Sequence, residues 1–103
     1  MSLSDQPSNK GVALVAEAAG TSILVCAYCL NLQYDDDAVY AAAPLAMSAI
    51  YFVLLMMLLP LSGAEMNPAI TFSILISARQ YRKHWQFAVM TICSQMIGGL
   101  LGM

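Results

Sequence analysis

The chain has 103 residues, of which 60 % are hydrophobic and 10 % charged, with a formal net charge of -2 and a mean hydropathy of +0.71. Soluble domains are about 45–50 % apolar, so this composition excludes an ordinary soluble domain and indicates an integral membrane protein. A single histidine and an isoelectric point near 4.9 also argue against an enzyme and against a basic surface for nucleic acid.

A polar tail precedes the first predicted helix. Residues 1–10 are expected to form a cytoplasmic tail, and residues 11–32 a transmembrane helix, because a helix needs roughly 20 apolar residues to cross the bilayer. A cleaved signal peptide is a weaker interpretation, since its apolar region is usually about 7–15 residues long. Glu17 is the one charge in this span, and a carboxylate in hydrocarbon costs on the order of 2.5–3.5 kcal/mol, so a partner is expected for it.

Residues 38–61 form the second predicted transmembrane helix. Pro44 and Pro60 lie near its ends, where the loss of one helical hydrogen bond is tolerated. Pro60 is expected to end the helix and begin the following loop.

The next apolar segment, residues 67–78, is too short to cross the membrane. It is expected to enter and return as a re-entrant half-helix, with its preceding turn buried against other helices or water. Asn67 and Pro68 suit its start, because asparagine is a strong N-cap and proline is favoured at the first helical position. A short helix lying flat on the surface is the alternative, although the segment has no charged face.

Residues 85–103 form the third predicted transmembrane helix. Ser94, Gly98 and Gly102 recur at intervals of four, a small-residue pattern that allows close approach to another helix, and Gly20 offers the same in the first span. This helix ends on Gly102 and Met103 without a polar flank, so we expect the sequence to be cut short there.

The basic residues predict the orientation. All four fall on one side if three helices span, and the positive side is normally cytoplasmic. The opposite connection carries three aspartates, with Tyr34 and Tyr40 as expected interfacial anchors. The N-terminus and the loop 79–84 are therefore predicted to be cytoplasmic, in the plasma membrane or an intracellular membrane, with the half-helix entering from the cytoplasm. The basic residues are Lys10, Arg79, Arg82 and Lys83.

A half-helix that starts near the middle of the membrane has a defined electrostatic character. Its N-terminus carries the equivalent of about +0.5 charge and unpaired N–H groups, which repel an isolated cation. The Asn67 side chain can donate a hydrogen bond to a passing oxygen. The segment therefore favours a neutral hydroxylic solute.

The motifs together resemble those of a known family. The residues Ser62-Gly63-Ala64 and Asn67-Pro68-Ala69-Ile70-Thr71 resemble the first NPA box of the aquaporin and glycerol-facilitator (major intrinsic protein) family. Glu17 to Thr21 resembles the Glu-x-x-Gly-Thr of its first helix, and Gln95 with the following glycines resembles its third helix. The resemblance implies an all-α integral membrane fold with three transmembrane helices and one re-entrant half-helix, half of an inverted-repeat channel.

The resemblance also implies a function, the passive permeation of water and of glycerol or other small neutral solutes, without a cofactor. Family channels pair two inverted repeats and are typically homotetrameric, so the implied partners are the lipid bilayer and a second repeat or homologous channel subunits. Ile70 rather than arginine follows the box, which resembles the amino-terminal repeat. Alone, this half is expected not to conduct.

Site residues follow from the same resemblance. Asn67, Pro68 and Ala69 would form the pore, with Asn67 contacting solute. Met47 falls at the second-helix position of the outer selectivity filter, where the family often has phenylalanine or tryptophan. The residues that would support the loop are Glu17, Gly63 and Gln95.

Glu65 stands where the family commonly has histidine, in a loop facing the cytoplasmic vestibule. Two interpretations remain open. It is a wetted surface carboxylate, or it concentrates cations or gates the mouth as it protonates, its pKa raised by partial desolvation.

Two other functions remain open for the whole chain. One is a non-conducting truncated subunit that associates with full-length relatives. The other is a small ion-coupled transporter that uses Glu17, although such transporters often lack the one-sided distribution of basic residues seen here. A metal site is not expected, because Cys26 and Cys29 lie on the opposite membrane side from His84 in this topology.

Overall fold

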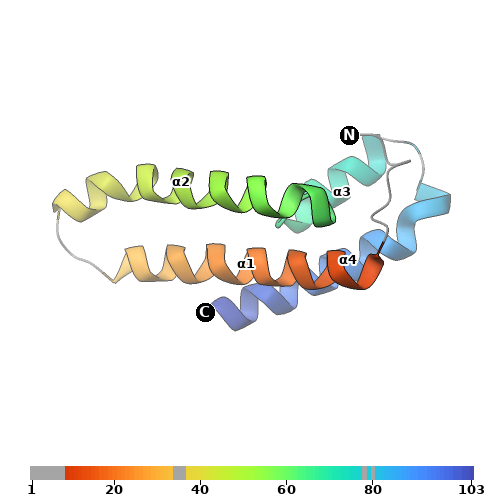
Figure 1. The fold of residues 1–103 in the computed structure, drawn as a ribbon, viewed down its shortest axis with the longest axis horizontal. Coiled ribbons are helices and arrows are strands. Elements are labelled where there is room, and N and C mark those ends of the chain that lie inside the picture. The colour runs from red at the N-terminus through yellow and green to blue at the C-terminus, as the bar shows by residue number, and fades with distance from the viewer. Residues whose placement is uncertain (1–8, 34–36, 78, 80) are drawn as a thin grey trace.

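The structure is a computed structural model that describes residues 9–33, 37–77, 79 and 81–103. The described residues form an elongated helical bundle with extents of 49 × 23 × 22 Å (Figure 1). Most of the expected tail and the expected anchor Tyr34 lie outside the described residues, as does the side chain of Tyr40. The described residues contain four helices, α1 (Lys10–Leu32), α2 (Asp37–Ser62), α3 (Pro68–Ser77) and α4 (Tyr81–Gly102).

The start of α1 corrects the expected boundary of the tail. The Asn9 side chain accepts hydrogen bonds from the backbone N–H groups of Gly11 at 3.1 Å and Val12 at 3.2 Å. An asparagine in this position satisfies N–H groups that have no partner within the helix. Lys10 is therefore the first helical residue and not part of the tail.

Helix α2 continues past Pro60, so the prediction that this proline ends the helix is wrong. A proline removes its own N–H, but the residues after it still have theirs. The helix reaches Ser62, and the N–H of Gly63 still donates to the carbonyl oxygen of Leu59 at 3.1 Å. The helix ends instead at Gly63, whose φ of 97° is incompatible with a right-handed helix.

Helix α4 also begins earlier in the chain than predicted. Residues 81–84 were expected in a loop, but α4 begins at Tyr81. Arginine and lysine are good helix formers, so this basic stretch continues the helix beyond its apolar part. The ammonium group of Lys10 lies 5.7 Å from the centre of the Phe87 ring, which brings the starts of α1 and α4 together.

Helix α1 is central to the bundle, with α2 antiparallel on one side and α4 parallel on the other (Figure 1). Helix α3 packs against α4. It starts beside the end of α2 and runs back toward the end of the molecule where α1 begins (Figure 1). The chain thus leaves α2, turns inward and comes back out.

The contact between α1 and α4 depends on two glycines. A Cβ atom at Gly98 would overlap the carbonyl oxygen of Ala18, and one at Gly102 would overlap that of Ser22. The absence of side chains lets the two backbones touch over two turns. Ser94, one turn earlier in α4, donates a hydrogen bond from Oγ to the α1 backbone.

Gly20 faces the other neighbour of α1. A Cβ there would lie 2.6 Å from Leu58 Cδ1 and 2.7 Å from Met66 Sδ. Met66 is buried with Leu54 and Ala64 in an apolar cluster between α2 and the loop. This cluster holds the loop against the helices.

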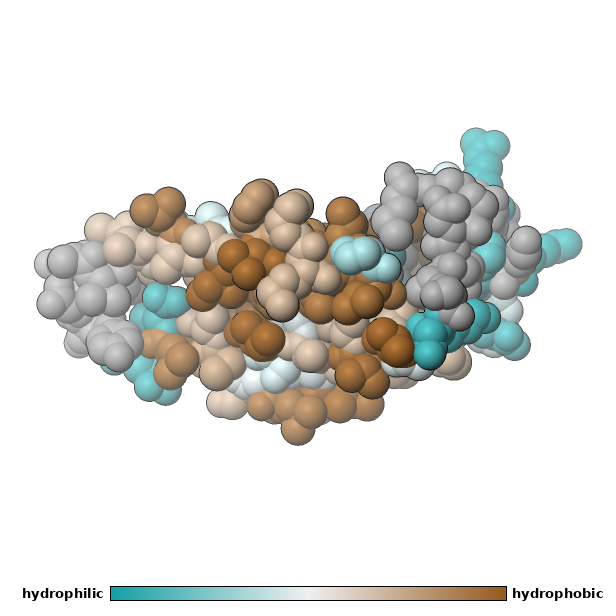
Figure 2. All heavy atoms as spheres, in the orientation of Figure 1, coloured by the Kyte–Doolittle hydropathy of each residue, from teal (hydrophilic) through white to brown (hydrophobic). Residues whose placement is uncertain are grey.

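Apolar side chains cover the middle of the molecule, and hydrophilic ones lie toward its two ends (Figure 2). Many large apolar side chains are more than half exposed, among them Leu45, Phe52 and Leu101. By length and composition, two helices within the described residues can cross a membrane, Lys10–Leu32 and Ala41–Ser62. Helix α4 is not among these candidates, since polar residues such as Gln86 and Gln95 lower its hydropathy.

Candidate functional site

The loop from Gly63 to Asn67 has an unusual backbone. Gly63, Ala64 and Met66 have positive φ values of 97°, 52° and 45°. For residues other than glycine this conformation costs roughly 1–2 kcal/mol each, so the surrounding contacts must stabilise it. Ala64 and Met66 are both buried, which supplies part of that stabilisation.

Glu17 on α1 supplies a further part of it. Its side chain is 1 % exposed and accepts four hydrogen bonds, two on each carboxylate oxygen. The backbone N–H groups of Glu65 and Met66 donate to it at 3.0 and 2.6 Å. Ser62 Oγ donates at 2.6 Å and Gln95 Nε2 at 2.8 Å. A buried carboxylate with four donors is stable without a counter-ion.

Helix α3 joins the same network through its first turn. The Thr71 hydroxyl accepts a hydrogen bond from Gln95 Nε2 at 3.0 Å. Gln95 and Thr71 are 1 % and 4 % exposed, so neither can exchange its partner for solvent. We call this set the polar network; it consists of Glu17, Ser62, Thr71, Gln95 and the backbone N–H groups of residues 65 and 66.

Asn67 caps α3 with its side chain and its carbonyl group. Oδ1 accepts from the Ala69 N–H at 2.9 Å, and the carbonyl oxygen accepts from the N–H groups of Ile70 and Thr71 at 3.0 and 3.1 Å. The first N–H groups of α3 are therefore paired, contrary to the expectation that these groups have no partner. The Asn67 side chain is exposed, and its Nδ2 donates to no acceptor within the described residues.

The Glu65 side chain is half-buried in the loop, outside the long helices. Burial raises the pKa of this carboxyl above its ordinary value, and the negative charge of Glu17 raises it further, while the Thr71 hydroxyl acts in the opposite direction. Its Oε2 atom is buried and accepts no hydrogen bond from any described residue. The carboxylate is thus not freely wetted.

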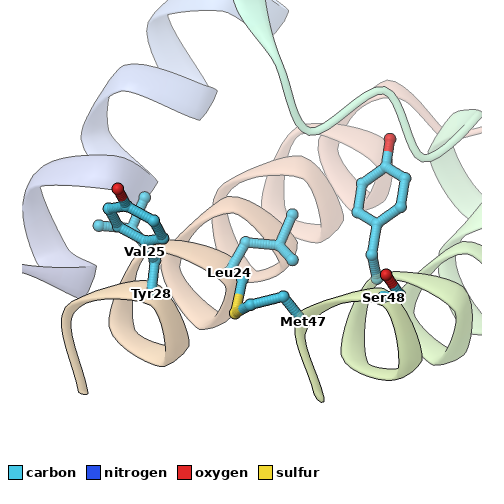
Figure 3. A pocket seen from close by; sticks show the side chains of 6 residues that line it. Leu24, Val25, Tyr28, Met47 and Ser48 are labelled. Atoms are coloured by element: carbon cyan, nitrogen blue, oxygen red, sulfur yellow. The ribbon is translucent and has the colours of Figure 1, made fainter. Parts of the chain in front are cut away.

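Met47 lies on the half of α2 far from the loop. It lines a pocket of about 470 Å³ between α1 and α2, with Leu24, Val25 and Tyr28 on the opposite helix (Figure 3). The Met47 sulfur accepts a hydrogen bond from Asn31 Nδ2 at 3.5 Å. This contact ties the thioether to the last turn of α1.

Two members of the polar network, Ser62 and Thr71, belong to the motif that resembles the NPA box, but the sequence analysis assigns no supporting role to their side chains. Each is a small hydroxyl residue at the edge of or within an apolar segment. The signal that could have identified them is that a polar side chain at membrane depth requires a partner.

The cysteines do not converge on a site. Cys26 and Cys93 are exposed and Cys29 is half-buried, all as free thiols. Among the described residues, no three histidine, cysteine or acidic side chains come together as metal ligands.

A family model described as "Major intrinsic protein" matches residues 2–102. The chain belongs to the major intrinsic protein family. Family membership and the exposed apolar helices together make it an all-α integral membrane protein.

A curated relative is similar over most of this chain. "Aquaglyceroporin AqpS" of Rhizobium meliloti (strain 1021) is 35 % identical over an alignment of 94 residues that covers 85 % of this chain and 39 % of the relative. The chain thus spans about two fifths of the length of this relative. No solved structure matches the chain.

Proposed function

We propose that this chain forms one half of a passive channel for water, glycerol and other small neutral solutes. In this proposal α1, α2 and α4 cross the membrane, and α3 enters from one side and returns to it. The observation that best supports this proposal is the direction of α3. It begins at a capped turn beside the end of α2 and runs back toward the end of the molecule where α1 begins. A helix of ten residues at 1.5 Å per residue covers about half of the hydrocarbon thickness.

The loop supports a wet path. The carbonyl oxygens of residues 63–66 accept no hydrogen bond from any described part of the chain. At membrane depth, backbone carbonyl groups need a partner, and lipid cannot provide one. We propose that hydroxyl groups of passing solutes donate to these oxygens, while Asn67 Nδ2 donates to the solute oxygen.

Charge selection follows from the same geometry. The positive end of the α3 dipole lies at Asn67, which disfavours a cation there. Glu17, the one carboxylate within α1, is fully committed to the loop by its four hydrogen bonds. This commitment favours a supporting role for Glu17 over proton or ion coupling, so an ion-coupled transporter is the weaker candidate.

The pocket at Met47 would form part of the outer narrowing. Methionine is unbranched and flexible, so this wall adapts to a solute more easily than an aromatic ring would. A wider, adaptable wall favours glycerol-sized solutes as well as water. The similarity to a protein named as an aquaglyceroporin supports the same substrate class.

Completion of the pore would require a second half-helix of opposite direction, from a second repeat or from a homologous subunit. In the proposed topology, the N-terminus and the basic residues around Arg79 and Arg82 face the cytoplasm. A non-conducting subunit that associates with longer relatives remains the second candidate.

The test is solute flux into proteoliposomes that contain this chain together with the carboxyl-terminal repeat of an aquaglyceroporin. Asn67→Asp keeps the oxygen that caps α3 but replaces the Nδ2 donor with an anionic oxygen. We expect glycerol flux to fall about tenfold, the equivalent of one hydrogen bond to a polar partner. Asn9→Asp makes the same change at the N-cap of α1 and should leave the flux unchanged.

Two results would contradict the proposal. Liposomes that contain both repeats, correctly inserted, and conduct no faster than empty ones would rule out the channel. Full conduction by the 103-residue chain alone would rule out its being half of a pore.

A further inference from the structure

Thr71 occupies a special place in the half-helix. It lies one turn after Asn67 and is 4 % exposed, and the other polar side chains of α3 are those of two serines. Its hydroxyl oxygen lies 3.0 Å from Gln95 Nε2 and 3.3 Å from Gln95 Oε1. The same oxygen lies 3.3 Å from the carbonyl oxygen of Asn67.

These contacts join the half-helix to the support of the loop. Gln95 Nε2 donates both to Glu17 and to Thr71, and Glu17 accepts the N–H groups of the loop before Asn67. The segment around Asn67 is therefore held on both sides, by Glu17 before it and by Thr71 after it. Both holds depend on the same glutamine.

We propose that Thr71 is a positioning residue, which fixes the rotation of the half-helix on α4 and thereby the direction of the Asn67 side-chain amide. The inference rests on the proposed function only in assigning a solute contact to Asn67. The proposal that Thr71 fixes the rotation of α3 on α4 depends only on contacts within this chain.

The physical reason is that the hydrogen bonds between Thr71 and Gln95 join α3 to α4 in a directional way, whereas apolar packing is not directional. Apolar packing between α3 and α4 resists separation, but it resists rotation and sliding less, because many rotations bury similar area. A hydrogen bond pair is directional and specifies one rotation. Residues four apart lie on the same helix face, so fixing Thr71 also fixes the backbone at Asn67.

The hydroxyl group is required in both of its roles. As an acceptor it receives the Gln95 Nε2 proton, and as a donor it has Gln95 Oε1 and the Asn67 carbonyl within reach. Valine has the same shape without either function, and serine keeps both with one methyl group fewer. The pair Thr71→Val and Thr71→Ser therefore separates the hydrogen bonds from the packing.

The experiment is solution NMR of the full chain, uniformly ¹⁵N-labelled, in lipid nanodiscs. We expect Thr71→Val to shift or broaden the Asn67 side-chain amide signal and to speed hydrogen exchange of the Ile70 N–H about tenfold. Thr71→Ser should restore both. Thr91→Val is the matched control, since Thr91 is equally buried but donates only to the carbonyl oxygen of Phe87 in its own helix.

A wild-type measurement keeps the inference falsifiable if Thr71→Val does not fold. The Thr71 hydroxyl proton should exchange slowly and show a nuclear Overhauser contact to the Gln95 amide. Absence of that contact would overturn the inference, as would an unchanged Asn67 signal in folded Thr71→Val or a serine variant no different from valine. None of these NMR measurements requires the chain to conduct. A negative result in the solute-flux test would therefore not change the outcome of this test.

Discussion

The glycine contact between α1 and α4 offers a controlled measurement, because two adjacent glycines meet different surroundings. A Cβ at Gly98 would overlap the backbone of Ala18. A Cβ at Gly99 would have its nearest neighbours, Thr21 Cγ2 and Val25 Cγ2, at 4.0 Å, which is ordinary van der Waals contact. Both positions are helical, so the two alanine substitutions gain the same helix propensity.

The expected difference in stability between the two variants follows from how far the helices must move to admit the new methyl group. In Gly98→Ala the backbones must separate near their closest approach, and overpacking of this kind costs about 1–3 kcal/mol. Gln95 lies one turn earlier in α4, so separation also stretches its 2.8 Å hydrogen bond to Glu17, worth about 1 kcal/mol more. We expect Gly98→Ala to be less stable than Gly99→Ala by about 2–4 kcal/mol, since the propensity gain of roughly 1 kcal/mol cancels between them.

The assay is reversible unfolding in mixed detergent micelles, followed by the fluorescence of Trp85, the one tryptophan of the chain. A difference of 2–4 kcal/mol changes the unfolding constant by about 30- to 1000-fold. Equal stability of the two variants would refute the reasoning, because it would show that the α1–α4 backbones are not in contact at Gly98.

Two further predictions concern the carboxylates. In Glu17→Gln, an amide group replaces an oxygen that accepts two hydrogen bonds, so exchange of the Met66 N–H should accelerate by about 30- to 1000-fold; unchanged exchange would contradict the supporting role. For Glu65, the raised folded pKa means that the folded state binds a proton more tightly than the unfolded state. Its contribution to the unfolding free energy is therefore fully present below the ordinary pKa and is lost as the pH rises through the folded value. Glu65→Gln should flatten this part of the pH profiles of both thermal stability and glycerol flux. Unchanged pH profiles would show that Glu65 is not the group that titrates.

Much of the architecture could be predicted from local features. Long apolar runs, a capping asparagine and a proline at a first helical position identify helices without any knowledge of their neighbours. Boundaries were less predictable. Pro60 stays inside α2 because only its own N–H is lost, and α4 starts at Tyr81 because basic residues are compatible with a helix outside the apolar region.

The polar network could be predicted only in part. The resemblance to the family predicts a supporting role for Glu17 and Gln95, whereas it names Ser62 and Thr71 only as part of the motif and gives their side chains no such role. Their importance depends on which side chains from four different helices and a loop meet at one place, and sequence separations of 24 to 78 residues give no local signal for that.

The sequence by itself determined that this is a membrane protein built of helices, with one apolar segment too short to cross, because hydrophobic length and helix caps are local properties. The tertiary structure decided how that short segment is held. The positive-φ backbone at Ala64 and Met66 is stabilised by burial and by Glu17, which accepts the N–H groups of Glu65 and Met66, and these donors in turn help to make Glu17 acceptable in an apolar interior. Such mutual dependence exists only when both partners are in place.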